Sequence, residues 1–157
     1  MFFAVLLNSR PRFGVCGKIM SSVENKALYR RYIELLWQPD RLNEVLAPNF
    51  VAHDLPPGLP PGQDGLKALR RLVEHAFPDL KPTIRDILAE GDRVAARVGL
   101  EGTHRGDFMG VAATGRPVAT EVFEIVRIEA SKIAERWVLR DRLSEFQQLG
   151  VLPAKLP

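Results

Sequence analysis

Residues 93–101, which read RVAARVGLE, decide the fold class of this chain of 157 residues. Apolar and charged side chains alternate along this stretch, with Val94, Ala96, Val98 and Leu100 on one parity. A period of two predicts a strand that turns one face toward a core and the other toward solvent. Three neighbouring stretches are also rich in Val and Ile and are predicted strands: residues 83–90, 117–129 and 131–139.

The first half of the chain has helical spacing instead. A helix capped by Ser21 or Ser22 is predicted up to Pro39, and a short one capped by Asp40 runs up to Pro48. A short strand over residues 49–55, an exposed loop over 56–62 and a third helix over 65–77 follow, and residues 141–150 form a closing helix that Gly150 stops.

Helices that come first and a meander of long strands that comes second predict an α+β fold. We expect the helices to pack on one face of a curved antiparallel sheet. The domain is expected to span residues 21–152, with a short tail over 153–157 and no internal repeat.

Residues 1–20 differ from the rest of the chain. Their apolar start is similar to the core of an export signal, but Arg and Pro interrupt it and no clear cleavage site follows. We expect a disordered or over-called extension, with Met20 as a plausible start; an export signal and an ordered part of the fold are the alternatives. Without Arg10, Arg12 and Lys18, which carry the net charge of +3, the basic and acidic residues balance.

Composition narrows the function classes. The chain is 46% hydrophobic and 26% charged, as in soluble globular proteins, and no apolar run reaches the ~18 residues that a membrane span requires. No basic stripe with aromatic residues is present, so we expect neither a nucleic-acid nor a membrane partner. The single Cys16 excludes an internal disulfide and fits a reducing compartment, and we expect a cytoplasmic protein.

A series of short motifs, taken in order, resembles the SnoaL-like polyketide cyclases over residues 22–150. The motifs are FVAHDLPPGLPPG, AFPDL, EGDRVAARV, GTHRGDFMG, TGRPV, KIAERW and QQLG. The resemblance implies the cone-shaped fold of the nuclear transport factor 2-like superfamily, with a pocket between the sheet and the helices. It also implies a homodimer through the open sheet face, and ring closure by aldol condensation with an aspartate as general acid/base and no metal or cofactor.

Asp141 is the first candidate for a catalytic group. If the strand continues to residue 141, Asp141 shares a parity with Ile133, Trp137 and Leu139, which suggests a carboxylate in an apolar pocket. Partial desolvation there raises a carboxyl pKa toward the range that suits proton transfer. Its position after Trp137 matches the acid/base aspartate of the family. The alternative from the residues alone is that Asp141 caps the closing helix.

His53 and His104 are the other candidate catalytic groups. Each can bind or polarise a substrate oxygen, and each can equally fix the loop beside it. Trp137, Phe108, Met109 and Tyr32 are candidates for binding substrate, although core packing explains each of them about as well.

Other chemistries have less support. His53, His104 and Asp141 are residue types that can ligate a metal. The two histidines are far apart in the sequence and form no HxH or HxxxH pair, so no metal site is predicted. The leading hypothesis is an acid/base enzyme, without a cofactor, on a small hydrophobic carbonyl compound such as a polyketide ester. The alternatives are an isomerase, dehydratase or epoxide hydrolase of the same fold, or a non-catalytic dimeric module that binds a small molecule.

Overall fold

The computed structural model describes residues 20–153. The predictions for residues 1–19 and for most of the tail lie outside this range. Three α-helices, one 3-10 helix and five strands are described. In chain order they are α1 (Ser22–Leu35), η1 (Pro39–Glu44), β1 (Leu46–Ala52), α2 (Gly62–Ala76), β2 (Lys81–Glu90), β3 (Arg93–Thr103), β4 (Pro117–Glu129), β5 (Lys132–Arg140) and α3 (Arg142–Leu149).

The helix ends follow the predicted caps at both ends of the domain. Ser21 and Glu24 form a capping box at the start of α1, in which each side chain accepts a hydrogen bond from the other residue's backbone N–H. The Asp141 side chain accepts a hydrogen bond from the N–H of Ser144 at the start of α3. Gly150 ends α3 with a φ of 79°, in the left-handed region that glycine adopts without strain.

The α+β prediction is confirmed, with one correction to the sheet. The strand order is β1-β5-β4-β3-β2, and β1 pairs with β5 in parallel, so the sheet is not wholly antiparallel. Pro48 was expected to precede the first strand, but it lies inside β1. Since β1 is an edge strand, the ring of Pro48 and its missing N–H are tolerated there.

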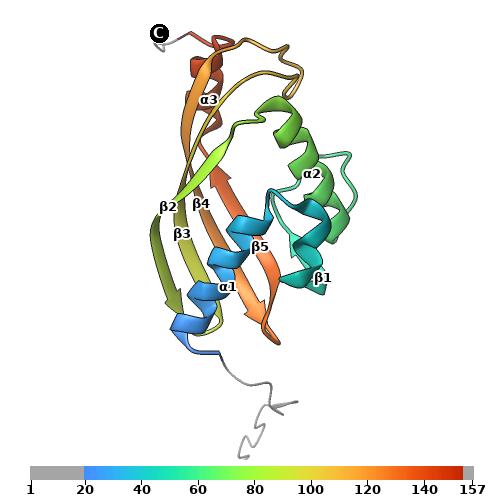
Figure 1. Ribbon diagram of the computed structural model, residues 1–157, viewed down its shortest axis with the longest axis vertical. Coiled ribbons are helices and arrows are strands. Elements are labelled where there is room, and N and C mark those ends of the chain that lie inside the picture. Colours follow the sequence, from blue (N-terminus) through green and yellow to red (C-terminus); the bar gives the residue numbers. More distant parts are fainter. Residues whose placement is uncertain (1–19, 154–157) are drawn as a thin grey trace, which may run out of the picture.

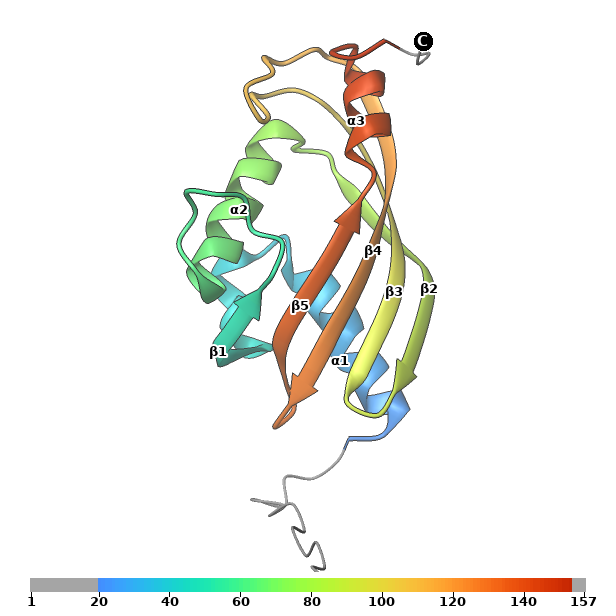
Figure 2. The same ribbon diagram turned by 180° about the vertical axis from the view of Figure 1, so that it is seen from behind.

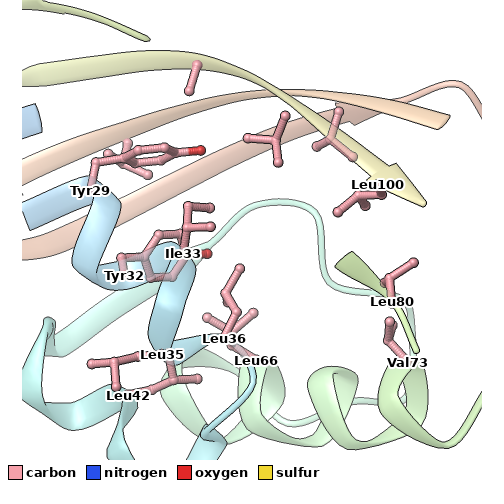
Figure 3. Packing of buried hydrophobic residues seen from close by; sticks show 14 of the residues in the cluster. Tyr29, Tyr32, Ile33, Leu35, Leu36, Leu42, Leu66, Val73, Leu80 and Leu100 are labelled. Carbon is pink, nitrogen blue, oxygen red and sulfur yellow. The ribbon is translucent and has the colours of Figure 1, made fainter. Parts of the chain in front are cut away.

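One face of the sheet carries the core. Helices α1 and α2 lie on this inner face, whereas Figure 2 looks onto the outer face, which they leave open (Figures 1 and 2). The predicted inward parity of β3 is confirmed, because Val94, Ala96, Val98 and Leu100 are all buried. Figure 3 shows Tyr29 and Tyr32 of α1 among the buried side chains between the helices and the sheet.

A bulge in β5 decides which of its side chains face the helices. Ile133 pairs with Ile128 and Glu135 pairs with Arg127, so Ala134 is an extra residue in the strand. Ile133 is buried, but beyond the bulge the inward parity passes to Arg136. The parity of Trp137 therefore faces outward, and the prediction that it faces a pocket under the helices is wrong.

Candidate active site

A cavity of about 260 Å³ lies between α2 and β5. The loop after β1 and the first residue of α3 complete its wall. Its lining is half apolar and half charged: Asp54, Pro56, Leu69, Arg70, Val73, Arg136, Val138, Leu139, Arg140 and Arg142. A cavity with an apolar wall and a few converging charged groups suits a small organic ligand.

Beside this cavity, Glu124 is a buried carboxylate in the middle of β4. The Tyr29 hydroxyl donates to its Oε2 at 2.8 Å, and the Tyr32 hydroxyl donates to its Oε1 at 3.1 Å. The guanidinium Nε of Arg136 donates to the same Oε1 at 2.7 Å. Three donors, two from α1 and one from β5, thus satisfy both oxygens of Glu124 inside the core.

Arg136 connects Glu124 to the cavity. Its Nη2 lies 3.2 Å from Oδ2 of Asp54, so one guanidinium bridges two carboxylates. The second oxygen of Asp54, Oδ1, is buried and has no hydrogen-bond partner among the described residues, and the same holds for Nη1 of Arg136. Five buried side-chain atoms lack a partner among the described residues, and these two belong to residues that line the cavity.

The environment shifts several pKa values in this cluster. Burial, then the charge of Glu124, raises the pKa of the Tyr29 phenol, and burial raises the pKa of Tyr32 well above its usual value. Burial alone lowers the pKa of Arg136, but Tyr32 and the two carboxylates outweigh it and raise that pKa above its ordinary value. The tyrosines therefore stay neutral donors, and Arg136 stays a cation.

Two further arginines of the cavity wall are also buried. Nearby groups offset the effect of burial on their pKa values less than they do for Arg136. Burial lowers the pKa of Arg70 to about 9 and that of Arg140 to about 10, so both are cations at neutral pH. Arg140 lies 3.7 Å from Glu145, which also binds Arg142 at 2.7 Å. The cavity therefore offers a carboxylate, Asp54, within a strongly cationic wall.

Asp141 lies away from this cluster. Its side chain is exposed and caps α3, as the alternative prediction stated. It contributes to a groove of about 600 Å³ that also includes Arg85, Glu101 and Phe123. The predicted partly desolvated position for this carboxylate is not found. Its role in proton transfer stays a prediction.

His53 joins a second cluster, at the other face of β5. Its ring stacks on Trp137 with centroids 4.7 Å apart, and its Nε2 lies 3.0 Å from Glu135. Glu135 also accepts from Nε of Arg127 at 2.6 Å. The hydrogen bonds from His53, then Arg127, lower the pKa of Glu135.

His104 is fully buried and holds the loop that follows β3. Its Nδ1 accepts a hydrogen bond from the backbone N–H of Thr114 at 3.2 Å, which fits the tautomer with the proton on Nε2. Phe77 and Phe108 pack against its ring, and Phe108 belongs to the core, whereas Met109 is exposed on the loop. This hydrogen bond is what the alternative role of His104, fixing the loop, requires, and its catalytic role stays a prediction.

Of the predicted residues, only Tyr32 belongs to the buried polar cluster. From the sequence we predicted no role in the site for Asp54, Glu124, Arg136 or Arg70. A signal for two of them was present: Glu124 interrupts the apolar parity of Val122 and Val126, and Arg70 follows Leu66 by four residues on the apolar side of its helix. A charge on an apolar face indicates a buried polar group.

Neither a metal-binding group of side chains nor a membrane-spanning helix is found in the described part of the chain. Within residues 20–153, no three His, Cys, Asp or Glu side chains are grouped so that they could hold a metal ion. In the same range, no helix has the length and apolar character needed to cross a membrane.

Comparisons with known proteins agree with the geometry of the fold. Residues 26–149 match the family model of the SnoaL-like polyketide cyclases. The aklanonic acid methyl ester cyclase DauD of Streptomyces sp. (strain C5) is 32% identical over 111 residues, which cover 69% of this chain and 66% of DauD. The cyclase of the same description from Streptomyces peucetius, DnrD, is 31% identical over 109 residues, 68% of this chain and 72% of the relative.

Solved structures extend the likeness to the whole domain. TsrD from Streptomyces laurentii superposes with a TM-score of 0.78 at 27% identity, over 85% of this chain and 99% of TsrD. This chain and TsrD therefore share the overall fold.

Proposed function

Because the chain belongs to the SnoaL-like polyketide cyclase family, we propose that it closes a ring in a polyketide-like carbonyl compound by general acid/base catalysis, without a metal or cofactor. The reaction takes place in the cavity between α2 and β5. The observation that carries this proposal is Asp54, which lines the cavity with one oxygen bound to Arg136 and the other without a partner among the described residues.

In the proposed reaction, Oδ1 of Asp54 removes a proton from a carbon that lies between carbonyl groups. The enolate carbon then attacks a second carbonyl carbon of the same molecule, so that one C–H bond breaks and one C–C bond forms. The new alkoxide oxygen takes the proton back from Asp54, and no atom is lost. Arg136 orients the carboxylate, and the cationic wall stabilises the charge on the enolate oxygen.

The cavity wall near Asp54 includes an apolar part. Leu69, Val73 and Val138 supply an apolar surface on which a flat ring system can lie. The two relatives are described as cyclases of aklanonic acid methyl ester, and this compound is the first substrate to test.

The test is ring closure of aklanonic acid methyl ester, followed by mass spectrometry and chiral chromatography. We expect the wild-type protein to give one stereoisomer and Asp54→Asn to lose about 10²–10⁴-fold in rate, the range typical of a lost acid/base group. The Asn side chain preserves size and a contact with Arg136, so a folded but inactive variant isolates the proton transfer. A wild-type protein that does not accelerate closure contradicts the proposal.

A second candidate function is a hydrolase that activates water, such as an epoxide hydrolase. It is favoured by the Asp54–Arg136–Glu124 bridge with two tyrosine hydroxyls, a buried set of polar groups that could hold a water. In this alternative, Asp54 takes a proton from a water that attacks an epoxide carbon, the C–O bond between that carbon and the ring oxygen breaks, and the released oxygen takes the proton back from Asp54. Styrene oxide in H₂¹⁸O distinguishes it, because hydrolysis places ¹⁸O in the diol and a cyclase leaves the epoxide intact.

We also propose that the protein forms a homodimer through the outer face of the sheet. Leu88, Phe123, Ile125 and Leu139 are large apolar side chains exposed on this face, and they line an open groove of about 620 Å³. Exposed apolar patches of this kind mark interaction surfaces. Leu139 is 73% exposed, so Leu139→Glu is expected to leave the fold intact and to give a monomer by light scattering.

A further inference from the structure

Asp54 and Arg136 form an ion pair that leaves part of each group unused. Nη2 of Arg136 lies 3.2 Å from Oδ2 of Asp54, whereas Oδ1 and Nη1 have no hydrogen-bond partner among the described residues. An arginine and a carboxylate frequently form two parallel hydrogen bonds, but here Oδ1 and Nη1 form none. The pair therefore keeps one free acceptor, Oδ1, and one free donor, Nη1.

The surrounding structure holds both groups in place. Nε of Arg136 donates to Oε1 of Glu124 at 2.7 Å, so Glu124 fixes the guanidinium from the core side. The backbone N–H of His53 donates to the backbone oxygen of Arg136 at 2.9 Å, which ties the residue before Asp54 to the same arginine. Because both groups are already held, a ligand that binds them loses little affinity to ordering the protein.

Both residues of the pair line the cavity between α2 and β5. Their side chains are 17% exposed for Asp54 and 10% exposed for Arg136, so neither residue is sealed in the core. A buried donor or acceptor without a partner costs free energy, and a ligand in the cavity that pairs with Oδ1 and Nη1 offsets this cost.

The free atoms select a ligand by its arrangement of donor and acceptor. The ligand must present a hydrogen to Oδ1 of Asp54 and an acceptor oxygen to Nη1 of Arg136. A carboxylate offers acceptors only, so one of its oxygens would face the negative Oδ1. A carbonyl group with a hydrogen on the neighbouring atom satisfies both. Since the charges of Asp54 and Arg136 balance each other, the favoured ligand is neutral.

We propose that Oδ1 of Asp54 and Nη1 of Arg136 together bind a carbonyl group and the hydrogen-bearing carbon next to it, so that the substrate class is a neutral ester or ketone and Arg136 is a catalytic donor. Oδ1 takes the proton, the electron pair of the broken C–H bond forms the C=C bond of the enolate, and the carbonyl electron pair moves to the oxygen. Nη1 donates to that oxygen as its charge develops. This inference rests on the proposed function, because it assigns the enolate oxygen within the same cavity.

The experiment uses three flat, neutral bicyclic compounds of similar size and isothermal titration calorimetry. Phthalimidine carries an N–H beside its carbonyl, in the place of the acidic C–H. Phthalide has a ring oxygen in place of this N–H, and indole has an N–H but no carbonyl. The wild-type protein is expected to bind phthalimidine at least about 10-fold more tightly than either of the others, because each of them loses a hydrogen bond to a charged group.

Asp54→Asn assigns the acceptor. If the amide oxygen stays on Arg136, the amide NH₂ takes the place of Oδ1, and a donor then faces the N–H of phthalimidine. The preference for phthalimidine over phthalide is therefore expected to disappear. Asp40→Asn is the matched control and is expected to keep the preference, because Asp40 also pairs with an arginine, Arg71, but is exposed and lies outside the cavity.

Four results would overturn the inference: no binding of phthalimidine, equal or tighter binding of phthalide, equal or tighter binding of indole, or a preference over phthalide that survives in Asp54→Asn. If Asp54→Asn does not fold, the three ligands on wild type still decide. Binding requires no turnover, so the two proposals fail separately. A protein that closes rings without the preference loses only the inference, and one that shows the preference without ring closure loses only the proposed function.

Discussion

Glu135 and Arg136 are neighbours on β5, yet they belong to two ion-pair clusters on opposite faces of the sheet. Arg136 joins Glu124 and Asp54 on the inner face, where its side chain and that of Glu124 are 10% and 4% exposed. Glu135 joins His53 and Arg127 on the outer face, with side chains of 25% and 41% exposure for Glu135 and His53. The two clusters contain the same kinds of groups at similar distances. They contribute differently to stability, because water screens one cluster and is excluded from the other.

The largest expected effect on stability is that of Glu124→Gln. Loss of this charge leaves Arg136 with half its compensation inside the core, and breaking a buried pair typically destabilises by about 3–5 kcal/mol. Urea unfolding at neutral pH measures the change. Glu135→Gln is the matched control on the outer face and is expected to move the unfolding midpoint far less. Equal shifts for the two variants would show that burial does not separate the clusters.

Tyr29→Phe is a smaller change to the inner-face cluster than Glu124→Gln. The change removes one hydroxyl that donates to Glu124 at 2.8 Å and keeps the ring in the core. A hydrogen bond to a charged group contributes about 1.5–3 kcal/mol, so a loss in this range is expected in the same urea assay. An unchanged midpoint would mean that Tyr32 and Arg136 satisfy Glu124 without it.

Asp141→Ala is expected to cost about 1 kcal/mol, the usual price of a lost helix cap. Asp141→Asn should cost nearly nothing, because Asn caps as well as Asp. Thermal unfolding followed by circular dichroism compares the pair. If both variants lose the same stability, the charge of Asp141 and not its cap matters to the fold.

The smallest effect concerns the pH dependence of the outer cluster. The folded-state pKa of Glu135 lies below its ordinary value of 4.5, because of His53 first and Arg127 second. A carboxyl whose pKa is lowered by folding stabilises the protein above its unfolded pKa and loses this contribution as the pH falls through the folded value. The difference in stability between wild type and Glu135→Gln should therefore be present at pH 7 and shrink as the pH falls below 4.5 and through the folded-state pKa. A difference that grows on acidification would reverse the sign of this argument.

The sequence predicts the fold better than the site, and β5 explains why. Alternation in β3 shows which face is inward, since its other parity is charged, and β4 runs over residues 117–129 as expected. In β5 the apolar side chains Trp137 and Leu139 lie on the open face, and the extra residue Ala134 changes the parity. A bulge depends on pairing with β4 and leaves no local pattern, so the inward parity of β5 was assigned to Trp137 instead of Arg136.

The measurement that tests the central claim most directly is the single-turnover rate of ring closure by Asp54→Asn and Asp141→Asn, measured side by side with wild type. The two substitutions are chemically identical, and each removes one carboxylate, one at the inner cavity and one at the exposed start of α3. If the chemistry takes place in the inner cavity, Asp54→Asn loses about 10²-fold or more and Asp141→Asn stays within a few-fold of wild type. The opposite ranking would contradict the account and return the proton transfer to Asp141.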